Sequence, residues 1–250
     1  MSEPIEYHDF LKLKITNPDP LVSSGVLYRG GKAVIYGKYK SMKSMLAMRL
    51  ALSLANGEKW LDFDTPKHGN AVLYLQLEIP LPLMQKRILQ TSVLTTKQPL
   101  HIWTEHFLKL DNPAGLTVLR EKLTQLNPAV LIVDPVYKVV GGDLLNTQHI
   151  QQLVDHIDML IGDFNIAVVM VHHTRKGVFE DWGSDDMLGS VIFSAWADSV
   201  IKIERDNSRI TVKFEVMRHA EEELPAREFV FTNKLDFIST QQQAVLGRII

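Results

Sequence analysis

The sequence contains no cysteine, which excludes disulfide bonds and thiolate metal sites and is consistent with a reducing compartment. It has no charge-free apolar run of the roughly 18 residues that a membrane span needs, so we expect no contact with a membrane. The first residues, MSEPIEYHDF, include acidic side chains and no apolar signal core, so we expect no export signal and a cytoplasmic protein. The net charge is only -2, so any contact with nucleic acid must come from a local patch.

The sequence does have a regular alternation of short apolar runs with segments of helical period. The runs are rich in valine, isoleucine and leucine and nearly continuous, as in strands that a parallel sheet buries on both faces. The pattern predicts an α/β doubly wound, mostly parallel sheet flanked by helices, with antiparallel strands added at the C-terminal edge. The expected strands are 33–36, 71–78, 100–104, 129–134, 166–173, 198–205, 209–217 and 227–232, and the expected helices are 43–56, 81–94, 113–126 and 146–162.

The same pattern suggests how the chain is organised. Residues 1–30 are less regular, with NPDP breaking any element, and we expect an N-terminal arm or a small strand addition there. The alternating core is expected over 31–240, followed by a C-terminal tail over 241–250. The 46% of hydrophobic residues can fill a sizeable core at this length.

A candidate phosphate-binding loop, GKYKSMKS, lies between the first apolar run and a helical segment. That context is what the pattern G-x-x-x-x-G-K-[ST] requires. Backbone N–H groups at the start of the helix would face the phosphates, Lys43 would reach the β- and γ-phosphates, and the Ser44 hydroxyl would bind Mg²⁺. The residues expected to bind the nucleotide are Gly37, Lys38, Tyr39, Lys40, Ser41, Met42, Lys43, Ser44 and Met45.

Met42 departs from this pattern, because it stands where the pattern has its second glycine. A methionine fits if the position has ordinary helical backbone angles, so that its side chain points away from the nucleotide and packs. For this stretch alone, the alternative is a surface loop with three lysines.

Polar groups also follow three other apolar runs. AVLIVD leads into Asp134, as in a Walker B strand, LYLQLE leads into Glu78, and VVMVHH ends in His172 and His173. Taken singly, each has a structural alternative: Asp134 capping the turn at Pro135, a surface glutamate, or a structural histidine. Together with the phosphate loop, all of them follow strands of one sheet, where doubly wound folds bind ligands. The combination predicts an enzyme that hydrolyses a nucleoside triphosphate.

These motifs resemble the RecA-like ATPases, and within them the hexameric replicative helicases of the RepA and DnaB type and their relatives in phages and plasmids. The resemblance covers about residues 25–235 and includes GKYKSMKSMLAMRLALSLANGEKWLDF, VLYLQLEIPLPLMQKRI, LIVDPVYKVV and VVMVHHTRKG. It implies ATP and Mg²⁺ as ligands, with Glu78 as general base and Asp134 as metal ligand. It also implies that His172 senses the γ-phosphate, at the glutamine position of the DnaB form.

The stretch KFEVMRHAEE resembles the strand from which DnaB-type helicases send a lysine and an arginine to the next subunit's γ-phosphate. Arg218 fits the arginine position, but Val216 occupies the lysine position. Lys213 could substitute only if it shared a face with Arg218, and on a regular strand these two residues point to opposite faces. The resemblance therefore implies a finger at Arg218 and a homo-oligomer, expected to be a hexamer; the alternative is a surface arginine.

Two loops would contact single-stranded DNA if the resemblance extends to that function. They are residues 136–148 and 174–189, and the basic residues expected to bind are Lys138, Arg175 and Lys176. The second loop carries more acidic than basic residues, so an ordinary solvated loop is an alternative. A regulatory or recombinase-type RecA-like ATPase without unwinding activity therefore stays open.

Overall fold

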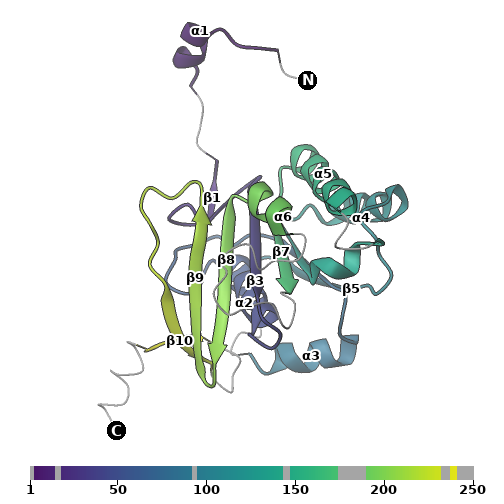
Figure 1. The fold of residues 1–250 in the computed structure, drawn as a ribbon, viewed down its shortest axis with the longest axis vertical. Coiled ribbons are helices and arrows are strands. Elements are labelled where there is room, and N and C mark those ends of the chain that lie inside the picture. The colour runs from purple at the N-terminus through teal and green to yellow at the C-terminus, as the bar shows by residue number, and fades with distance from the viewer. Residues whose placement is uncertain are drawn as a thin grey trace.

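A nine-stranded sheet forms the centre of the molecule, in the order β11-β10-β9-β8-β3-β7-β6-β4-β5 (Figure 1). The computed structural model describes residues 3–14, 18–91, 95–142, 147–173, 190–231 and 237–240. The strands are β1 Pro20–Val22, β2 Leu27–Tyr28, β3 Lys32–Gly37, β4 Val72–Gln76, β5 Leu100–Thr104, β6 Val130–Asp134, β7 Ala167–His173, β8 Ser199–Asp206, β9 Arg209–Met217, β10 Arg227–Phe231 and β11 Phe237–Ser239. The helices are α1 Tyr7–Lys12, α2 Lys43–Asn56, α3 Leu81–Leu89, α4 Pro113–Leu126, the 3-10 turn η1 Val136–Val139, α5 Thr147–Phe164 and α6 Ser190–Trp196.

The pairing of the strands confirms the predicted architecture. Strands β5, β4, β6, β7, β3 and β8 run parallel to one another. Strands β9, β10 and β11 are added antiparallel at the edge, β9 through the turn at Asn207 and Ser208. The apolar runs are therefore buried on both faces because helices cover both sides of the parallel part.

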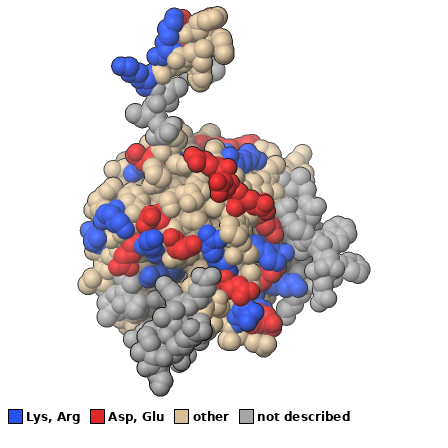
Figure 2. Space-filling model, turned by 90° about the vertical axis from the view of Figure 1, so that its left-hand side faces the viewer, with Lys and Arg blue, Asp and Glu red and all other residues tan. Residues whose placement is uncertain are grey.

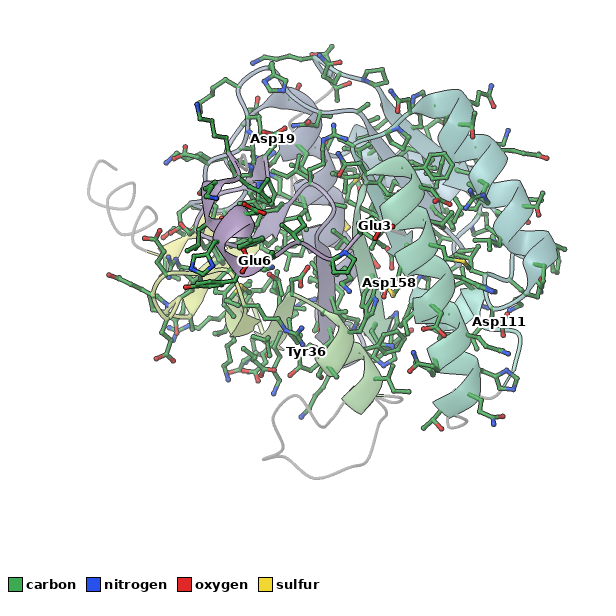
Figure 3. All side chains as sticks on the ribbon, turned by 90° about the horizontal axis from the view of Figure 1, so that it is seen from above. Glu3, Glu6, Asp19, Tyr36, Asp111 and Asp158 are labelled. Carbon is green, nitrogen blue, oxygen red and sulfur yellow. The ribbon has the colours of Figure 1, made fainter. Side chains whose placement is uncertain are left out.

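Two hydrophobic clusters lie between the sheet and its helices, one on each face of the sheet. On one face, α2 packs through residues such as Leu46 and Leu50, and α3 contributes Met84. On the other face, α4, α5 and α6 pack through residues such as Leu119, Ile157 and Phe193. Helices α4 and α5 lie side by side on this second face, which Figure 3 shows from above. The sheet is thus the middle of three layers. A strand residue packs in one cluster or the other according to the face of the sheet from which its side chain projects.

The described part of the N-terminal arm divides into two pieces. Strands β1 and β2 form a small antiparallel sheet whose Leu21, Val22 and Leu27 are buried in the same cluster as α2. Helix α1 buries none of its residues and stands clear of the sheet in Figure 1. No helix within the described ranges is both long enough and apolar enough for a membrane span.

The observed elements differ from the expected ones mainly at their ends. The strand expected over 71–78 ends at Gln76, because the Gln76 side-chain carbonyl accepts hydrogen bonds from the N–H groups of Glu78 and Ile79 and turns the chain out of the sheet. Helix α3 ends at Leu89 instead of continuing to residue 94. Residues 92–94, 174–189 and the tail 241–250 lie outside the described residues.

Strand β9 contains a register shift, which changes the faces on which Lys213 and Arg218 lie. Val216 pairs with Val200 on β8, but Phe214 pairs with Ile201, so Glu215 is an extra residue. Val216 and Phe214 consequently pack in opposite clusters although they are two residues apart. The expectation that Lys213 and Arg218 point to opposite faces is therefore wrong, because the shift reverses the alternation between them.

Candidate functional site

The carboxyl ends of four neighbouring parallel strands carry the candidate site. In the order β3, β7, β6 and β4, the register pairs Gly37 with His173 and Gln76 with Asp134. The chain continues from Gly37 into the phosphate-loop sequence and from Gln76 toward Glu78. Strand pairing thus brings together the groups that lie far apart in the sequence.

Gly37, the first residue of the loop, leaves β3 against the backbone of β8. A Cβ atom there would lie 2.2 Å from the Ile203 carbonyl oxygen and 2.9 Å from the Ser41 hydroxyl. Only glycine allows this close approach. The requirement explains the glycine at this position of the pattern.

Met42 adopts a left-handed backbone conformation, with φ 76° and ψ 22°. The ordinary helical angles expected from the sequence are therefore wrong for this residue, which takes the conformation that glycine takes most readily. Lys40 is left-handed too, with φ 62°, because the loop must turn from β3 into α2 within a few residues. The second half of the expectation holds, since the Met42 side chain packs against the core cluster under α2.

Helix α2 begins at Lys43, directly after the loop expected to bind phosphate. Met42 at its N-cap gives no side-chain cap to the first turn, so these N–H groups stay available to an anion. The Lys43 side chain is buried, and its ammonium donates hydrogen bonds to the carbonyl oxygens of Gly37 at 2.8 Å and Lys38 at 2.7 Å. Burial lowers the pKa of Lys43 to about 8, opposed by the charges of Asp134 and Glu78.

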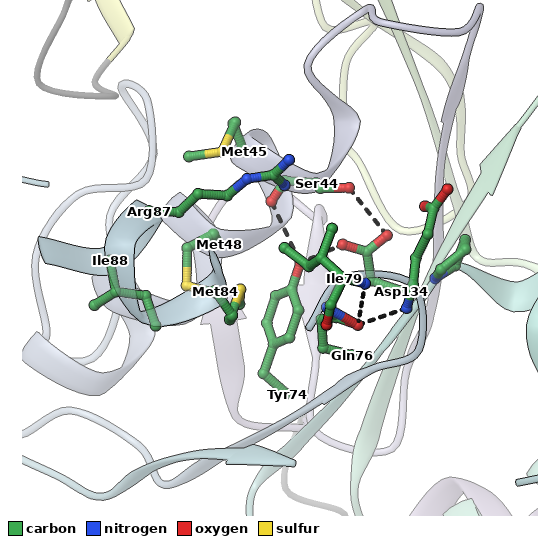
Figure 4. A pocket seen from close by; sticks show the side chains of 12 residues that line it. Ser44, Met45, Met48, Tyr74, Gln76, Ile79, Met84, Arg87, Ile88 and Asp134 are labelled. Carbon is green, nitrogen blue, oxygen red and sulfur yellow. Dashed lines mark hydrogen bonds between the residues drawn. The ribbon is translucent and has the colours of Figure 1, made fainter. Parts of the chain in front are cut away.

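Asp134 is buried at the end of β6, where its two carboxylate oxygens have different partners (Figure 4). The Ser44 hydroxyl lies 3.1 Å from Oδ1, and the Tyr74 hydroxyl donates to Oδ2 at 2.5 Å. Burial raises the pKa of Asp134, and the hydrogen bonds from Tyr74 and Ser44 oppose that rise. The carboxylate is therefore held in one orientation beside the start of α2.

The donor set beside α2 fits Mg²⁺. The Ser44 hydroxyl and the Asp134 carboxylate are hard oxygen donors, and their 3.1 Å separation places them on one side of a single small site. They line a cleft that also includes Glu78 and Arg87. Chemically, the arrangement combines a buried cation for phosphate oxygens with a carboxylate and a hydroxyl for a divalent ion.

Glu78 lies on an exposed turn just beyond β4. The Gln76 side chain builds this turn: it accepts from the Glu78 N–H at 2.5 Å and donates to the Ile79 carbonyl oxygen at 2.5 Å. The Glu78 carboxylate lies 3.4 Å from the Tyr137 hydroxyl of η1. It also acts electrostatically on Lys43 and Asp134, so it belongs to the same site.

The two histidines at the end of β7 point to opposite faces of the sheet. His172 is buried at 1% exposure, with its ring 5.3 Å from that of Phe193 on α6. His173 lies on the face of the phosphate loop, with its ring 5.7 Å from Tyr137. Burial, assisted by the charge of Lys43, lowers the pKa of His173 to about 4. The structure therefore places His173, and not His172, beside the candidate site.

Arg218 follows β9 at the end of the sheet away from the phosphate loop. Its N–H donates to the Asp198 carbonyl oxygen just before β8, and its guanidinium donates to the Ala195 carbonyl oxygen of α6. Since Tyr36 pairs with Lys202 further along β8, Arg218 lies several residues' length from Gly37. It cannot reach the site of its own chain.

Of the residues expected to contact DNA, Lys138 is described, on η1, with its ammonium 5.5 Å from the Tyr137 ring centroid. Arg175 and Lys176 lie outside the described residues. Acidic and basic side chains are intermixed on the face shown in Figure 2, which looks onto the antiparallel edge of the sheet. Ion pairs such as Lys213–Glu204 at 2.8 Å and Arg209–Glu228 at 3.7 Å account for part of this mixture.

The sequence did not predict Tyr74, Gln76 and Tyr137 as members of the site, and of the two histidines it predicted the sensor role for His172. Tyr74 and Gln76 are buried polar residues inside an otherwise apolar strand. Because buried polar groups need partners, their position in AVLYLQLE was a usable signal. Tyr137 gave no comparable signal, since only the packing of η1 brings it near Glu78.

A second hollow borders the phosphate loop on the side of the β8–β9 hairpin. Its volume is 660 Å³, and its walls are the loop from Gly37 to Ser41 and hairpin residues such as Lys202, Arg205 and Thr211. This volume is in the range of small-molecule sites. The loop is therefore open on one side to the cleft with Asp134 and on the other to this larger hollow.

The chain matches a known protein family and resembles solved structures in fold. The AAA domain family matches residues 3–178, and no curated protein matches the chain. A solved structure described as an ATPase domain superposes with a TM-score of 0.66 at 12% identity, covering 84% of this chain and 85% of that one. A KaiC-like protein from the hyperthermophilic archaeon Pyrococcus horikoshii OT3 gives a TM-score of 0.61 at 10% identity, covering 88% and 93%.

At these identities the likeness to solved structures is one of fold, and the site rests on this chain's own residues. The family match spans more than half of the chain and includes the phosphate loop, Glu78, Asp134 and both histidines. The chain therefore belongs to the AAA domain family and has a RecA-like fold.

Proposed function

We propose that the chain is a motor that hydrolyses Mg-ATP and moves along single-stranded DNA, as a hexameric helicase of the RepA and DnaB type. The observation that carries the proposal is that Ser44, Asp134 and Glu78 line one cleft, while the buried Lys43 ammonium interacts electrostatically with both carboxylates. The motifs that resemble those helicases supply the DNA part of the proposal.

Nucleotide binding uses the loop from Gly37 to Met45. The N–H groups at the start of α2 bind phosphate oxygens, and the Lys43 ammonium exchanges its loop carbonyls for the β- and γ-phosphates. The hollow beside the β8–β9 hairpin is large enough for a nucleoside. Mg²⁺, held by Ser44 and Asp134, supplies positive charge that offsets the charge of the phosphates when it is bound.

Hydrolysis follows as an in-line attack of water on the γ-phosphorus. Glu78 orients the water and accepts its proton, the new P–O bond forms, and the bond to the β–γ bridging oxygen breaks. Lys43 stabilises the charge that develops on the phosphate oxygens. His173 takes the sensor role in place of His172, because its ring is on the side of Lys43 and its pKa of about 4 keeps it neutral at pH 7.

Arg218 serves a neighbouring subunit in this proposal. It lies at the far end of the sheet from its own phosphate loop, and a finger there can complete only another copy's site. A head-to-tail contact of this kind closes into a ring, for which the resemblance suggests a hexamer. The corrected register of β9 also returns Lys213 to the face of Arg218, although Lys213 is paired with Glu204.

The DNA would pass along the loops 136–148 and 174–189, with Lys138, Arg175 and Lys176 as phosphate contacts. A regulatory ATPase that does not bind DNA is the second candidate. One observation favours it: acidic residues outnumber basic ones in the second loop.

ATP turnover with and without single-stranded DNA tests the proposal. We expect hydrolysis that DNA stimulates, and a loss of at least about 100-fold in Lys43→Ala, the scale of removing one strong contact to the transition state. Lys59→Ala, an exposed lysine paired with Asp64, is the matched control and should keep full activity. Equal turnover in Lys43→Ala would refute the ATP site, and turnover indifferent to DNA would favour the regulatory candidate.

Mixing two inactive variants tests the finger. Arg218→Ala keeps an intact ATP site, and Lys43→Ala keeps an intact finger, so a mixed ring contains some complete sites. We expect the mixture to recover activity that neither variant has alone. Full activity of Arg218→Ala by itself would remove the finger role.

A further inference from the structure

We propose that Tyr137 is the positioning residue for Glu78, and that Lys109 acts through it by fixing the turn on which Tyr137 stands. The inference deepens the proposed function, since it rests on ATP hydrolysis with Glu78 as the base. Neither residue contacts the phosphate loop in the hydrogen bonds that the structure gives them.

Glu78 needs such a partner because its side chain is exposed. Its backbone is fixed by Gln76, but an exposed glutamate side chain has several rotamers of similar energy. A base that must hold water in line with the γ-phosphorus works only from a narrow range of positions, and displacement by about 1 Å can cost about 100-fold in rate. A contact that selects one position of the carboxylate therefore acts directly on turnover.

Tyr137 is placed to make that contact. Its hydroxyl, on η1, donates to Glu78 Oε1 at 3.4 Å. Its ring makes a T-shaped contact with the His173 ring, at 5.7 Å and 80°, and the Lys138 ammonium lies 5.5 Å from its centroid. Burial and the nearby carboxylates raise the pKa of Tyr137 to about 12, so the phenol remains a donor at neutral pH.

The turn η1 that carries Tyr137 is anchored from a segment following β5. The Lys109 ammonium donates to the carbonyl oxygens of Lys138 at 2.6 Å and Val140 at 3.1 Å. The Asp111 carboxylate accepts from the N–H groups of Gly141 at 2.7 Å and Gly142 at 3.3 Å. These bonds hold the end of η1 against the body, so the position of the Tyr137 hydroxyl depends on Lys109.

The test is the steady-state ATPase of Tyr137→Phe and Lys109→Ala. Phenylalanine keeps the ring contacts with His173 and Lys138 and removes only the donor. We expect kcat to fall about 3- to 10-fold in each variant, the scale of one ordinary hydrogen bond, while KM for ATP stays within about 2-fold. A general loss of packing would instead change nucleotide affinity or thermal stability.

The double variant and a Glu78 background show whether the two residues act through the base. Tyr137→Phe with Lys109→Ala should be no slower than the slower single variant, since both remove one constraint. In single-turnover assays on Glu78→Gln, adding Tyr137→Phe should change the remaining rate by less than about 2-fold. Tyr7→Phe and Lys59→Ala, both exposed side chains, are controls with no expected effect.

The outcomes separate this inference from the function on which it rests. If the wild-type chain hydrolyses ATP and Tyr137→Phe keeps its kcat, the positioning role is refuted and the ATPase stands. If the losses in Tyr137→Phe and Glu78→Gln multiply independently, Tyr137 acts elsewhere and the inference is also refuted. If the wild-type chain does not hydrolyse ATP, both fall. Should Lys109→Ala melt below the assay temperature, Tyr137→Phe alone decides.

Discussion

The hydroxyl of Tyr74 donates a 2.5 Å hydrogen bond to Oδ2 of Asp134, between the neighbouring strands β4 and β6. The other carboxylate oxygen is left facing Ser44 at 3.1 Å. The tyrosine thus occupies one oxygen of a buried carboxylate and directs the second toward the start of α2. In a site that binds Mg²⁺, this division keeps the carboxylate from rotating away.

Replacing Tyr74 with phenylalanine tests this division of the two oxygens. The variant leaves a buried carboxylate oxygen without its donor, which should cost about 1–3 kcal/mol of unfolding free energy. We also expect the Mg²⁺ concentration for half-maximal ATPase activity to rise about 3- to 10-fold, because the carboxylate is less well oriented. Urea unfolding and a Mg²⁺ titration measure the two effects, with Tyr7→Phe on α1 as the control. An unchanged Mg²⁺ requirement would show that Tyr74 has a structural role alone.

The left-handed backbone of Met42 makes a contrasting pair of substitutions informative. Valine is β-branched and strongly disfavoured at φ 76°, so Met42→Val should unfold at lower urea and lose about 1–2 kcal/mol. Met42→Gly removes the strain but also the packing of the side chain, and should stay within about 1 kcal/mol of the wild type. Nucleotide affinity measured by titration should follow the same order. Equal stability of the two variants would contradict the left-handed assignment.

The two histidines of β7 should give opposite results when each is replaced by alanine. His173→Ala should lower kcat by at least about 10-fold with a small change in stability, because its ring lies at the site. His172→Ala should lower the unfolding free energy by about 1–3 kcal/mol, because it opens a cavity beside Phe193. Its turnover per folded molecule should stay within about 3-fold. Parallel ATPase and urea experiments distinguish the two; a severe kcat loss in His172→Ala alone would restore the sensor role to that residue.

The depressed pKa of His173 predicts a pH dependence of stability. The unfolded chain takes up this proton near the ordinary value of 6.5, and the folded chain takes it up only near 4, so between these values the unfolded state binds more protons. Stability is therefore lost as pH falls from 6.5 toward 4, by at most about 1.4 kcal/mol per pH unit and less for a partly exposed ring. In His173→Gln, the unfolding free energy measured in urea should change less steeply with pH across this window. The carboxylates that also titrate there are common to both proteins. An identical slope would mean that His173 titrates normally.

The order of strands and helices could be predicted from the sequence because the periodicity of apolar residues in a strand or a helix is a local property. Helices 43–56 and 113–126 have the expected bounds. Lys43, Glu78 and Asp134 were expected beyond the carboxyl ends of strands because each is a polar residue that follows an apolar run. These features depend on a few neighbouring residues, so a single sequence is enough to read them. The nucleotide-binding site could therefore be assigned to one edge of one sheet before its geometry was known.

The finer assignments failed where they depended on neighbouring elements. AVVMV, which leads into the two histidines, is apolar along its whole length and gives no alternation from which to choose a face. Packing alone decided that His172 lies against α6 and His173 on the side of the phosphate loop. The extra residue at Glu215 appears only through the pairing of β9 with β8. The backbone of Met42 is set by the short path between β3 and α2.

The sequence by itself determined the chemistry that this protein carries: an ammonium, a hydroxyl and two carboxylates, each joined to its own strand or helix. Tertiary structure alone decided which oxygen of Asp134 faces Ser44, which histidine meets the site, and that the Tyr137 hydroxyl contacts Glu78. The reason is physical: covalent neighbours set local conformation, whereas contacts between side chains distant in the chain exist only once the sheet has fixed strand order and register.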